Sequence, residues 1–172
     1  QAPLLPFLPE NVHGTNVLAL AVCHIGDPKQ GEDILKPLRG FGKVVGEHVG
    51  VQPFKDWQQV FDPLLTPGAR NYWKSHNFRE LKNDVLDIVA DYAGKLPSDQ
   101  CEIFFASLGG AVNRVDPGAT AYSHRDANYV LNVHGRWSEP SDDDRCIGWA
   151  RDFFAASEPH ATGGVYVNFM TA

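Results

Sequence analysis

The sequence predicts an α+β fold in which helices pack on an antiparallel or mixed sheet. Apolar residues at helical spacing alternate along the chain with short runs of β-branched and aromatic residues, in the approximate order β-α-β-α-β-α-β-β-α-β. Late in this order, the turn residues Asp116, Pro117 and Gly118 precede a long alternating segment within residues 120–137, which is typical of a hairpin. Because hairpin strands are antiparallel, an α+β arrangement is favoured over a doubly wound parallel sheet.

Length and composition are those of an ordinary globular protein. With 172 residues, of which 43% are hydrophobic and 21% charged, the chain is long enough for one core, and we expect a single domain over residues 1–172. The formal net charge of −6 and the lack of a basic stripe argue against nucleic acid as a partner. The longest apolar run, residues 17–23, is far shorter than the roughly 20 residues that cross a membrane. No membrane partner is therefore expected.

The cysteines and the chain ends indicate the setting. Cys23, Cys101 and Cys146 are odd in number, widely spaced and without a CxxC pair, so neither a disulfide framework nor a zinc site is predicted. A reducing, cytoplasmic setting is expected. The chain opens on the proline-rich QAPLLPFLPE without an initiator Met and stops just after an expected strand, so we interpret it as a piece of a longer protein.

The first part of the chain predicts two strands and two helices. Residues 16–25 are a nearly continuous apolar run, as in a buried strand. Asp27 and Pro28 then suit the N-cap and the first position of a helix that ends near Gly40 and Gly42. Residues 43–51 alternate weakly and predict a second strand, and residues 54–65 carry apolar side chains at helical spacing.

A strand at residues 70–74 and a helix at residues 80–96 follow. Alternation places Tyr72 and Lys74 on one side of the strand and Trp73 on the other. The simplest assignment puts Trp73 in the core and lets Tyr72 and Lys74 face a cleft, although a surface Lys beside a half-buried Tyr is the more ordinary structural interpretation.

The next strands are expected at residues 101–108 and, after two glycines, at residues 111–115. Residues 129–134 then alternate, with one side formed by Tyr129, Leu131 and Val133 and the other by Val130, Asn132 and His134. Ser141 precedes three aspartates and a helix that runs to about Ser157. These aspartates lack the spacing of a calcium loop, and we interpret them as helix-capping charges without a metal.

The last ten residues, GGVYVNFMTA, predict a terminal strand. Tyr166 and Asn168 are expected on one face and Val165, Val167 and Phe169 on the other. Two interpretations fit this pattern: an ordinary sheet strand with one polar face, or a strand whose phenol and amide contact a flat polar ligand. No GxSxG, HExxH, phosphate-binding GxxxxGK[ST] or GxGxxG motif is present, so any catalysis is expected to rely on a cofactor.

Several stretches taken in order resemble a known family. LLTPGARNYWKSHNF, FASLGGAVNRVDPGATAYSHRDANYVLNVHGRW, IGWARDFF and GGVYVNFM are similar to the substrate-binding and C-terminal part of FAD-linked oxidases of the berberine bridge enzyme-like group, within the vanillyl-alcohol oxidase superfamily. The resemblance implies FAD as cofactor, bound mainly by a flavin domain of the same polypeptide that would precede Gln1. It also implies a small-molecule substrate and a closing helical segment after Ala172.

The resemblance also implies roles for individual residues. Tyr166 and Asn168 match the family's Y-x-N motif beside the flavin, so Tyr166 is expected as a catalytic and flavin-contacting residue and Asn168 as a flavin-binding residue. Tyr72, Asn132 and His134 are the expected substrate-binding residues. In many such oxidases a tyrosine acting as a base follows the asparagine, whereas this chain has Phe169, which cannot exchange a proton.

The expected activity is oxidation of a small organic substrate by proton abstraction and hydride transfer to flavin in the full-length protein. By itself, the chain is expected to be colourless and inactive. The alternative is a non-enzymatic α+β ligand-binding module with aromatic-rich strands.

Overall fold

The computed structural model describes residues 1–171. The chain divides into two compact units, Gln1–Pro67 and Gly68–Ala172. The first contains helices α1 (Pro28–Arg39) and α2 (Phe54–Trp57) and two short 3-10 turns, η1 (Glu10–Val12) and η2 (Asp62–Leu64). The predicted start of α1 is confirmed, because the Asp27 side chain accepts a hydrogen bond of 2.8 Å from the backbone N–H of Lys29 and Pro28 occupies the first turn.

The other predictions for this unit are wrong in part. Residues 16–25 and 43–51 form no strand, and apolar side chains within them are exposed, with Leu18 81% exposed. A strand is stabilised through its cross-strand pairs, and neither run is paired with another strand in the described chain. The helix expected at residues 54–65 ends at Trp57. Beyond Trp57 the chain continues in tighter turns, in which Gln59 N–H donates to the Asp56 carbonyl and Val60 N–H to the Trp57 carbonyl at 3.1 and 3.2 Å.

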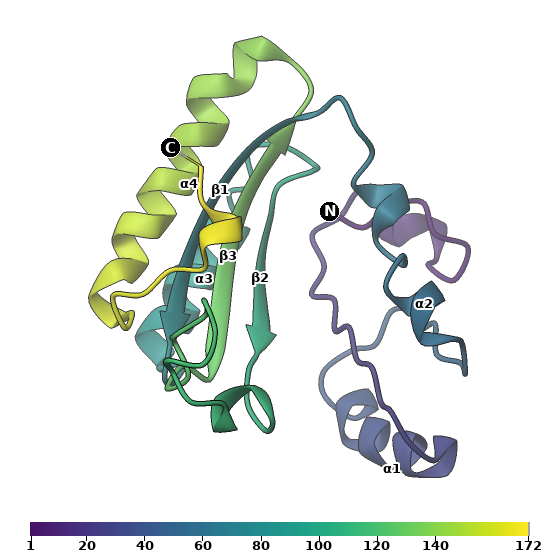
Figure 1. The fold of residues 1–172 in the computed structure, drawn as a ribbon. Helices are drawn as coiled ribbons and strands as arrows, with labels where there is room; N and C mark the ends of the chain where they lie inside the picture. Colours follow the sequence, from purple (N-terminus) through teal and green to yellow (C-terminus); the bar gives the residue numbers. More distant parts are fainter. Residues whose placement is uncertain (172) are drawn as a thin grey trace. The chain divides into compact units, whose positions relative to one another are not determined.

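The second unit is built on a three-stranded antiparallel sheet of order β1-β3-β2. Its strands are β1 (Arg70–Phe78), β2 (Glu102–Ser107) and β3 (Tyr129–Trp137). Two helices, α3 (Asn83–Ala93) and α4 (Asp143–Ser157), pack on one face of this sheet (Figure 1). The predicted α+β class is therefore confirmed.

The core lies between the sheet and these two helices. Leu131 and Val133 of β3 meet Val85 of α3 and Phe153 of α4, and none of the four is exposed to solvent. Burying an aliphatic or aromatic side chain of this size contributes about 1.5–3 kcal/mol. Leu131 and Val133 share one side of β3, as its alternation predicts, and the helices cover that side.

The assignment of faces on β1 is the reverse of the expected one. Tyr72 is buried in the core, 4% exposed, while Trp73 lies on the opposite face and is half-buried. The register decides this: Lys74 pairs with Val133 and Trp73 with His134, so Lys74 and Tyr72 share the core side of the sheet. Alternation separates the two sides of a strand but does not indicate which side the helices cover.

Two further segments differ from their predictions. Residues 111–115 form no strand and instead contain the 3-10 turn η3 (Val112–Arg114). Positive φ angles of 151° at Gly109 and 56° at Gly110 turn the chain away from the sheet at this point. The N-cap of α4 is Asp142 rather than Ser141, and its side chain makes no capping hydrogen bond.

Two short 3-10 turns complete this unit. One, η4 (Pro140–Asp142), leads into α4, and the other, η5 (Glu158–His160), follows it. The terminal strand expected at residues 163–172 is replaced by an irregular segment with the 3-10 turn η6 (Val167–Phe169), and Ala172 lies outside the described residues. None of the described helices is long and apolar enough to cross a membrane.

His76 makes the stability of this unit dependent on pH. Its ring stacks on Phe154 at a centroid distance of 3.9 Å, and its Nε2 lies 2.9 Å from the Phe154 carbonyl oxygen. Burial lowers the pKa of His76 below its ordinary value. The imidazole of His76 therefore binds a proton more readily in the unfolded chain than in the folded chain. For this reason the free energy of unfolding should decrease as the pH falls through about 6.5 and below.

We expect His76→Phe, which keeps a ring beside Phe154 but removes the titrating group, to flatten this dependence. Urea unfolding between pH 5 and 8 measures it. His24→Gln, at an exposed position, is the control and should leave the slope unchanged. An equal slope in wild type and His76→Phe would assign the dependence to other groups.

Candidate functional site

The sheet face away from the helices carries a buried polar row. Ser75 and Asn77 of β1 and Asn132 and His134 of β3 are all 0% exposed. They share a face because Ser75 pairs with Asn132, and Asn77 and His134 each lie two residues from one of these positions. Asn132 and His134 are therefore brought together, as the sequence predicts.

His134 is held from three sides. Its Nδ1 lies 3.2 Å from Glu102 Oε1, its Nε2 lies 2.9 Å from Asn71 Oδ1, and its ring stacks on Trp73 at a centroid distance of 3.6 Å. Glu102 and Trp73 are the direct cross-strand neighbours of His134 in the two ladders. This packing fixes the orientation of the imidazole and of the Trp73 ring above it.

Polar atoms in the row are left without hydrogen-bond partners. Asn132 donates from Nδ2 to the Lys74 carbonyl oxygen at 3.2 Å, while its Oδ1 has no partner, and Asn77 has none at either side-chain atom. An unpaired buried polar group costs about 1–3 kcal/mol, and such groups are rare in folded proteins. The row is thus able to accept and donate hydrogen bonds beyond those within the chain.

The C-terminal segment closes the free edge of β1 at two points. The backbone of Asn77 bonds with Thr162 and Gly164 at 2.9 and 3.1 Å. Thr171 N–H donates to the Trp73 carbonyl at 2.9 Å, and Trp73 N–H donates to Thr171 Oγ1 at 3.0 Å. Between these contacts the chain leaves the edge and forms η6, visible in Figure 1 as the yellow turn beside β1.

Ser75 anchors the part of the segment that leaves the edge. Its hydroxyl accepts a hydrogen bond of 2.9 Å from Tyr166 N–H and donates one of 3.3 Å to the Tyr166 carbonyl oxygen. The η6 turn then folds Asn168 back, and its Nδ2 donates to Tyr166 Oη at 2.8 Å. Tyr166 and Asn168 meet as predicted, through a 3-10 turn rather than through strand alternation.

Aromatic rings cover the polar row. Phe169 stacks on Trp73 at 5.8 Å and meets Phe104 edge-on at 5.4 Å and Tyr166 edge-on at 5.0 Å. Tyr122, from the loop between β2 and β3, meets Tyr166 edge-on at 5.9 Å. We refer to these five rings as the aromatic cover. Edge-on and offset pairs of this kind contribute about 0.5–1.5 kcal/mol each beyond area burial.

Tyr122 is a site residue that sequence reasoning missed. It lies in a loop without periodicity, so no local pattern places it near Tyr166. Its Oη is buried without a partner, and burial raises the pKa of its phenol. The guanidinium of Arg125 lies 5.1 Å from its ring centre. Tyr122 therefore stays protonated at neutral pH and is able to donate a hydrogen bond.

Gly164 sets how closely this loop approaches the C-terminal segment. A Cβ atom at this position would lie 2.5 Å from ring atoms of His124. The glycine pair at the start of the segment was the sequence signal for this close approach.

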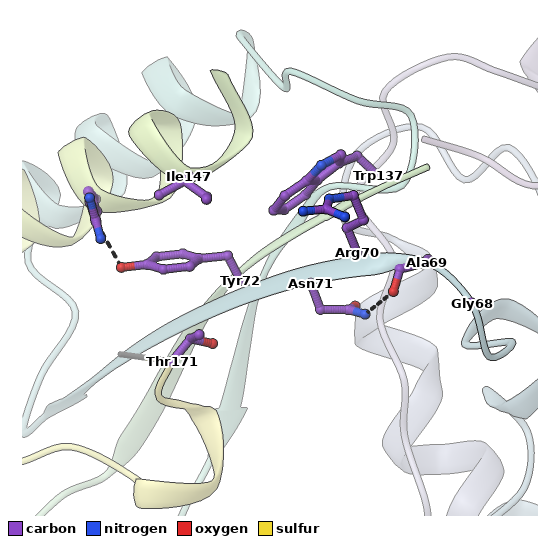
Figure 2. A pocket seen from close by; sticks show the side chains of 9 residues that line it. Gly68, Ala69, Arg70, Asn71, Tyr72, Trp137, Ile147 and Thr171 are labelled. Atoms are coloured by element: carbon purple, nitrogen blue, oxygen red, sulfur yellow. Dashed lines mark hydrogen bonds between the residues drawn. The ribbon is translucent and has the colours of Figure 1, made fainter. Parts of the chain in front are cut away.

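Tyr72 does not join the other predicted substrate residues. It lies on the helix side of the sheet, and its Oη accepts a hydrogen bond of 2.9 Å from Arg151 Nε. It lines a separate pocket at the edge of β1, shown in Figure 2. In residues 1–171 no group of three or more His, Cys, Asp or Glu side chains is arranged to hold a metal ion.

The chain is similar to FAD-linked oxidoreductases. It is 24% identical over 149 residues to one from Dictyostelium discoideum, covering 86% of this chain and 33% of that protein. It is 26% identical over 170 residues to the uncharacterized FAD-linked oxidoreductase YgaK of Bacillus subtilis, covering 96% of this chain and 36% of the relative. No protein-family model matches the chain.

A solved structure shares the fold. The berberine bridge enzyme-like (BBE-like) protein #28 of Arabidopsis thaliana superposes with a TM-score of 0.68 at 18% identity, over 86% of this chain and 35% of that one. The expected resemblance to FAD-linked oxidoreductases and the BBE-like fold is therefore confirmed. The chain spans about one third of the length of the curated relatives it matches.

The two hydrogen bonds of Ser75 give a direct test of the site's construction. In Ser75→Ala, the Tyr166 N–H loses its acceptor, which should lower the local opening free energy of the C-terminal segment by about 1 kcal/mol or more. Hydrogen exchange followed by mass spectrometry should show faster exchange at Tyr166 and the η6 turn. Ser107→Ala, at the exposed end of β2, should leave this exchange unchanged, and unaltered protection in Ser75→Ala would remove Ser75 from the anchoring of Tyr166.

Proposed function

We propose that this chain is the substrate-binding part of an FAD-dependent oxidoreductase, which oxidises a small organic substrate by hydride transfer to flavin. The relatives that match the chain are FAD-linked oxidoreductases. The observation that carries the proposal is the Tyr166–Asn168 hydrogen bond of 2.8 Å, which holds a phenol and an amide together beside the aromatic cover. A flavin domain of the same polypeptide would be the partner of this surface.

The residues around η6 fit a flat, polar cofactor. Asn168 is exposed and uses its Nδ2 on Tyr166, which leaves its Oδ1 as an acceptor for a ring N–H. Tyr166 and Phe169 are half-buried and add aromatic surface next to it. Asn168 and Tyr166 would therefore contact the flavin, while most of the cofactor would be held by the flavin domain.

In the proposed reaction, flavin held by Tyr166, Asn168 and the flavin domain would supply the acceptor for a hydride from the substrate carbon. Tyr166 orients the substrate or, as a phenolate that has first lost its own proton to solvent, takes up the substrate proton at Oη. The Asn168 N–H donates to that oxygen and would stabilise the phenolate charge, which proton uptake then removes. Phe169 contributes no proton transfer and packs against Trp73 and Phe104, which keeps water from one side of the phenol.

The substrate side of the proposal rests on the polar row. Asn132 Oδ1 has no partner within the chain and is 0% exposed, so it would accept a hydrogen bond from a substrate hydroxyl or amine only when the rings of the aromatic cover move apart. His134 would act by holding Trp73 in place, since its own ring is 0% exposed and stacked beneath that indole. Any substrate contact of Tyr72 would occur separately, in the pocket at the edge of β1.

The full-length protein with Tyr166→Phe tests the role of the phenol. If Tyr166 transfers the proton, flavin reduction by substrate in an anaerobic stopped-flow experiment should slow by about 100-fold or more. Tyr92→Phe, on helix α3 in the core, is the matched control and should reduce flavin at the wild-type rate. Reduction at the wild-type rate in Tyr166→Phe would exclude the phenol from the chemistry.

The chain by itself gives a second test. Because the proposal leaves most flavin contacts to another domain, purified residues 1–172 should be colourless and should not reduce oxygen with substrate. The absorbance spectrum between 350 and 500 nm measures this. Stoichiometric flavin absorbance in the purified chain would contradict the division of roles proposed here.

A further inference from the structure

Positive charge gathers around Tyr72 on the helix side of β1, in a chain whose formal net charge is −6. The Lys74 ammonium lies 5.5 Å from the centre of the Tyr72 ring, and the Arg151 guanidinium lies 5.3 Å from it. Arg70 lies at the start of the same strand. Like charges beside one ring repel each other, and a bound anion would offset that repulsion.

Two of these cations, Arg70 and Arg151, line a pocket of about 540 Å³ at the edge of β1. Figure 2 shows the side chains of Arg70, Tyr72, Trp137 and Ile147 around it, with Asn71 and Thr171 along the strand. Arg151 completes the lining from α4. Arg70, Tyr72, Trp137 and Ile147 line the pocket from the helix side of the sheet, whereas Asn71, which also contacts His134, lines it from the face of the Ser75–Asn132 row. Arg151 and Tyr72 are therefore separate from the residues assigned to the flavin.

Arg151 is oriented by the phenol of Tyr72 and, among the described residues, by no carboxylate. Its Nε donates to Tyr72 Oη at 2.9 Å, and its guanidinium packs over the Tyr72 ring. Within the described part of the chain no acidic side chain pairs with it, so both of its terminal nitrogens remain donors for a ligand. Lys74 is similar: its Nζ donates to the Thr171 carbonyl at 2.9 Å and has no described ion pair.

The nearby carboxylate is already engaged by other groups. Asp143 accepts hydrogen bonds from Arg70 Nη2 at 2.6 Å and from Trp137 Nε1 at 2.7 Å. Arg70 and Trp137 hold the pKa of Asp143 below its ordinary value, so it is ionised at neutral pH and neutralises Arg70. It leaves the charges of Arg151 and Lys74 uncompensated.

We propose that this pocket binds a small oxyanion, a carboxylate or phosphate group, through the terminal nitrogens of Arg151. The planar guanidinium fork matches such groups with two parallel hydrogen bonds, and Tyr72 fixes its orientation in advance. Lys74 supplies a second positive charge beside the same ring. This inference is independent of the proposed oxidoreductase function, because it uses none of the residues assigned to flavin or proton transfer.

Titration of the full-length protein with inorganic phosphate and, separately, with succinate tests the site. Trp137 lines the pocket, so its indole N–H resonance should shift as the anion binds. Arg151→Gln should weaken binding by about tenfold or more, the loss expected for one charge-assisted contact. Arg151→Lys should retain part of the affinity, because it keeps the charge but not the fork.

Arg145→Gln is the matched control, since Arg145 lies on the same helix and pairs with Asp142 at 2.9 Å. It should bind both anions as wild type does. The two anions distinguish a phosphate-bearing from a carboxylate-bearing ligand by which binds more tightly. No saturable shift of the Trp137 resonance with either anion, or equal weakening in Arg145→Gln and Arg151→Gln, would overturn the proposal.

Discussion

The arrangement of the second unit depends on how the free edge of β1 is closed. An exposed strand edge presents unpaired backbone groups, and here the C-terminal segment satisfies those of Trp73, near the middle of β1, and of Asn77, near its end. Between those two residues, the side-chain hydroxyl of Ser75 accepts a hydrogen bond from the backbone N–H of Tyr166. Because its hydroxyl replaces a ladder hydrogen bond, the segment is free to bulge outward, and the bulge is what brings Tyr166 and Asn168 together.

The same strand separates two kinds of chemistry. On one side, Tyr72 joins the core beneath α4 and orients Arg151 at the pocket on the edge of β1. On the other side, Ser75 belongs to a buried polar row under aromatic rings. Side chains alternate across a strand, so a shift of register by one residue would exchange these two surfaces. The pairing of β1 with β3 therefore matters for both proposals.

Local patterns predicted the parts of the fold that depend on local interactions. The Asp27 cap and Pro28 mark the start of α1 because both act within one turn, and alternation places Leu131 and Val133 on one side of β3, the side that the helices cover. Residues 16–25 have strand composition but no strand partner, and composition does not report a partner. Alternation likewise did not show whether Tyr72 or Trp73 belongs to the core, because it does not report which face the helices cover.

For the candidate site, too, the sequence predicted the residues that local spacing brings together and missed those that only the tertiary fold brings together. Asn132 and His134 were found together because they lie two residues apart on one strand, and Tyr166 and Asn168 because short spacing keeps them close in either a strand or a turn. Tyr122 was missed, since a loop residue reaches its neighbours only through the tertiary fold. Tyr72 was misplaced because its side of the sheet depends on helices that lie later in the chain.

The phenols near η6 differ in what they are able to do. Burial raises the pKa of Tyr122, which keeps its proton in place, whereas Tyr166 receives an N–H from Asn168 and stands at the exposed side of the cover. Phe169 has no proton to exchange and stacks on Trp73, whose indole is in turn fixed by His134. In the proposed reaction, proton transfer is therefore assigned to Tyr166, and Tyr122 and Phe169 pack against that phenol.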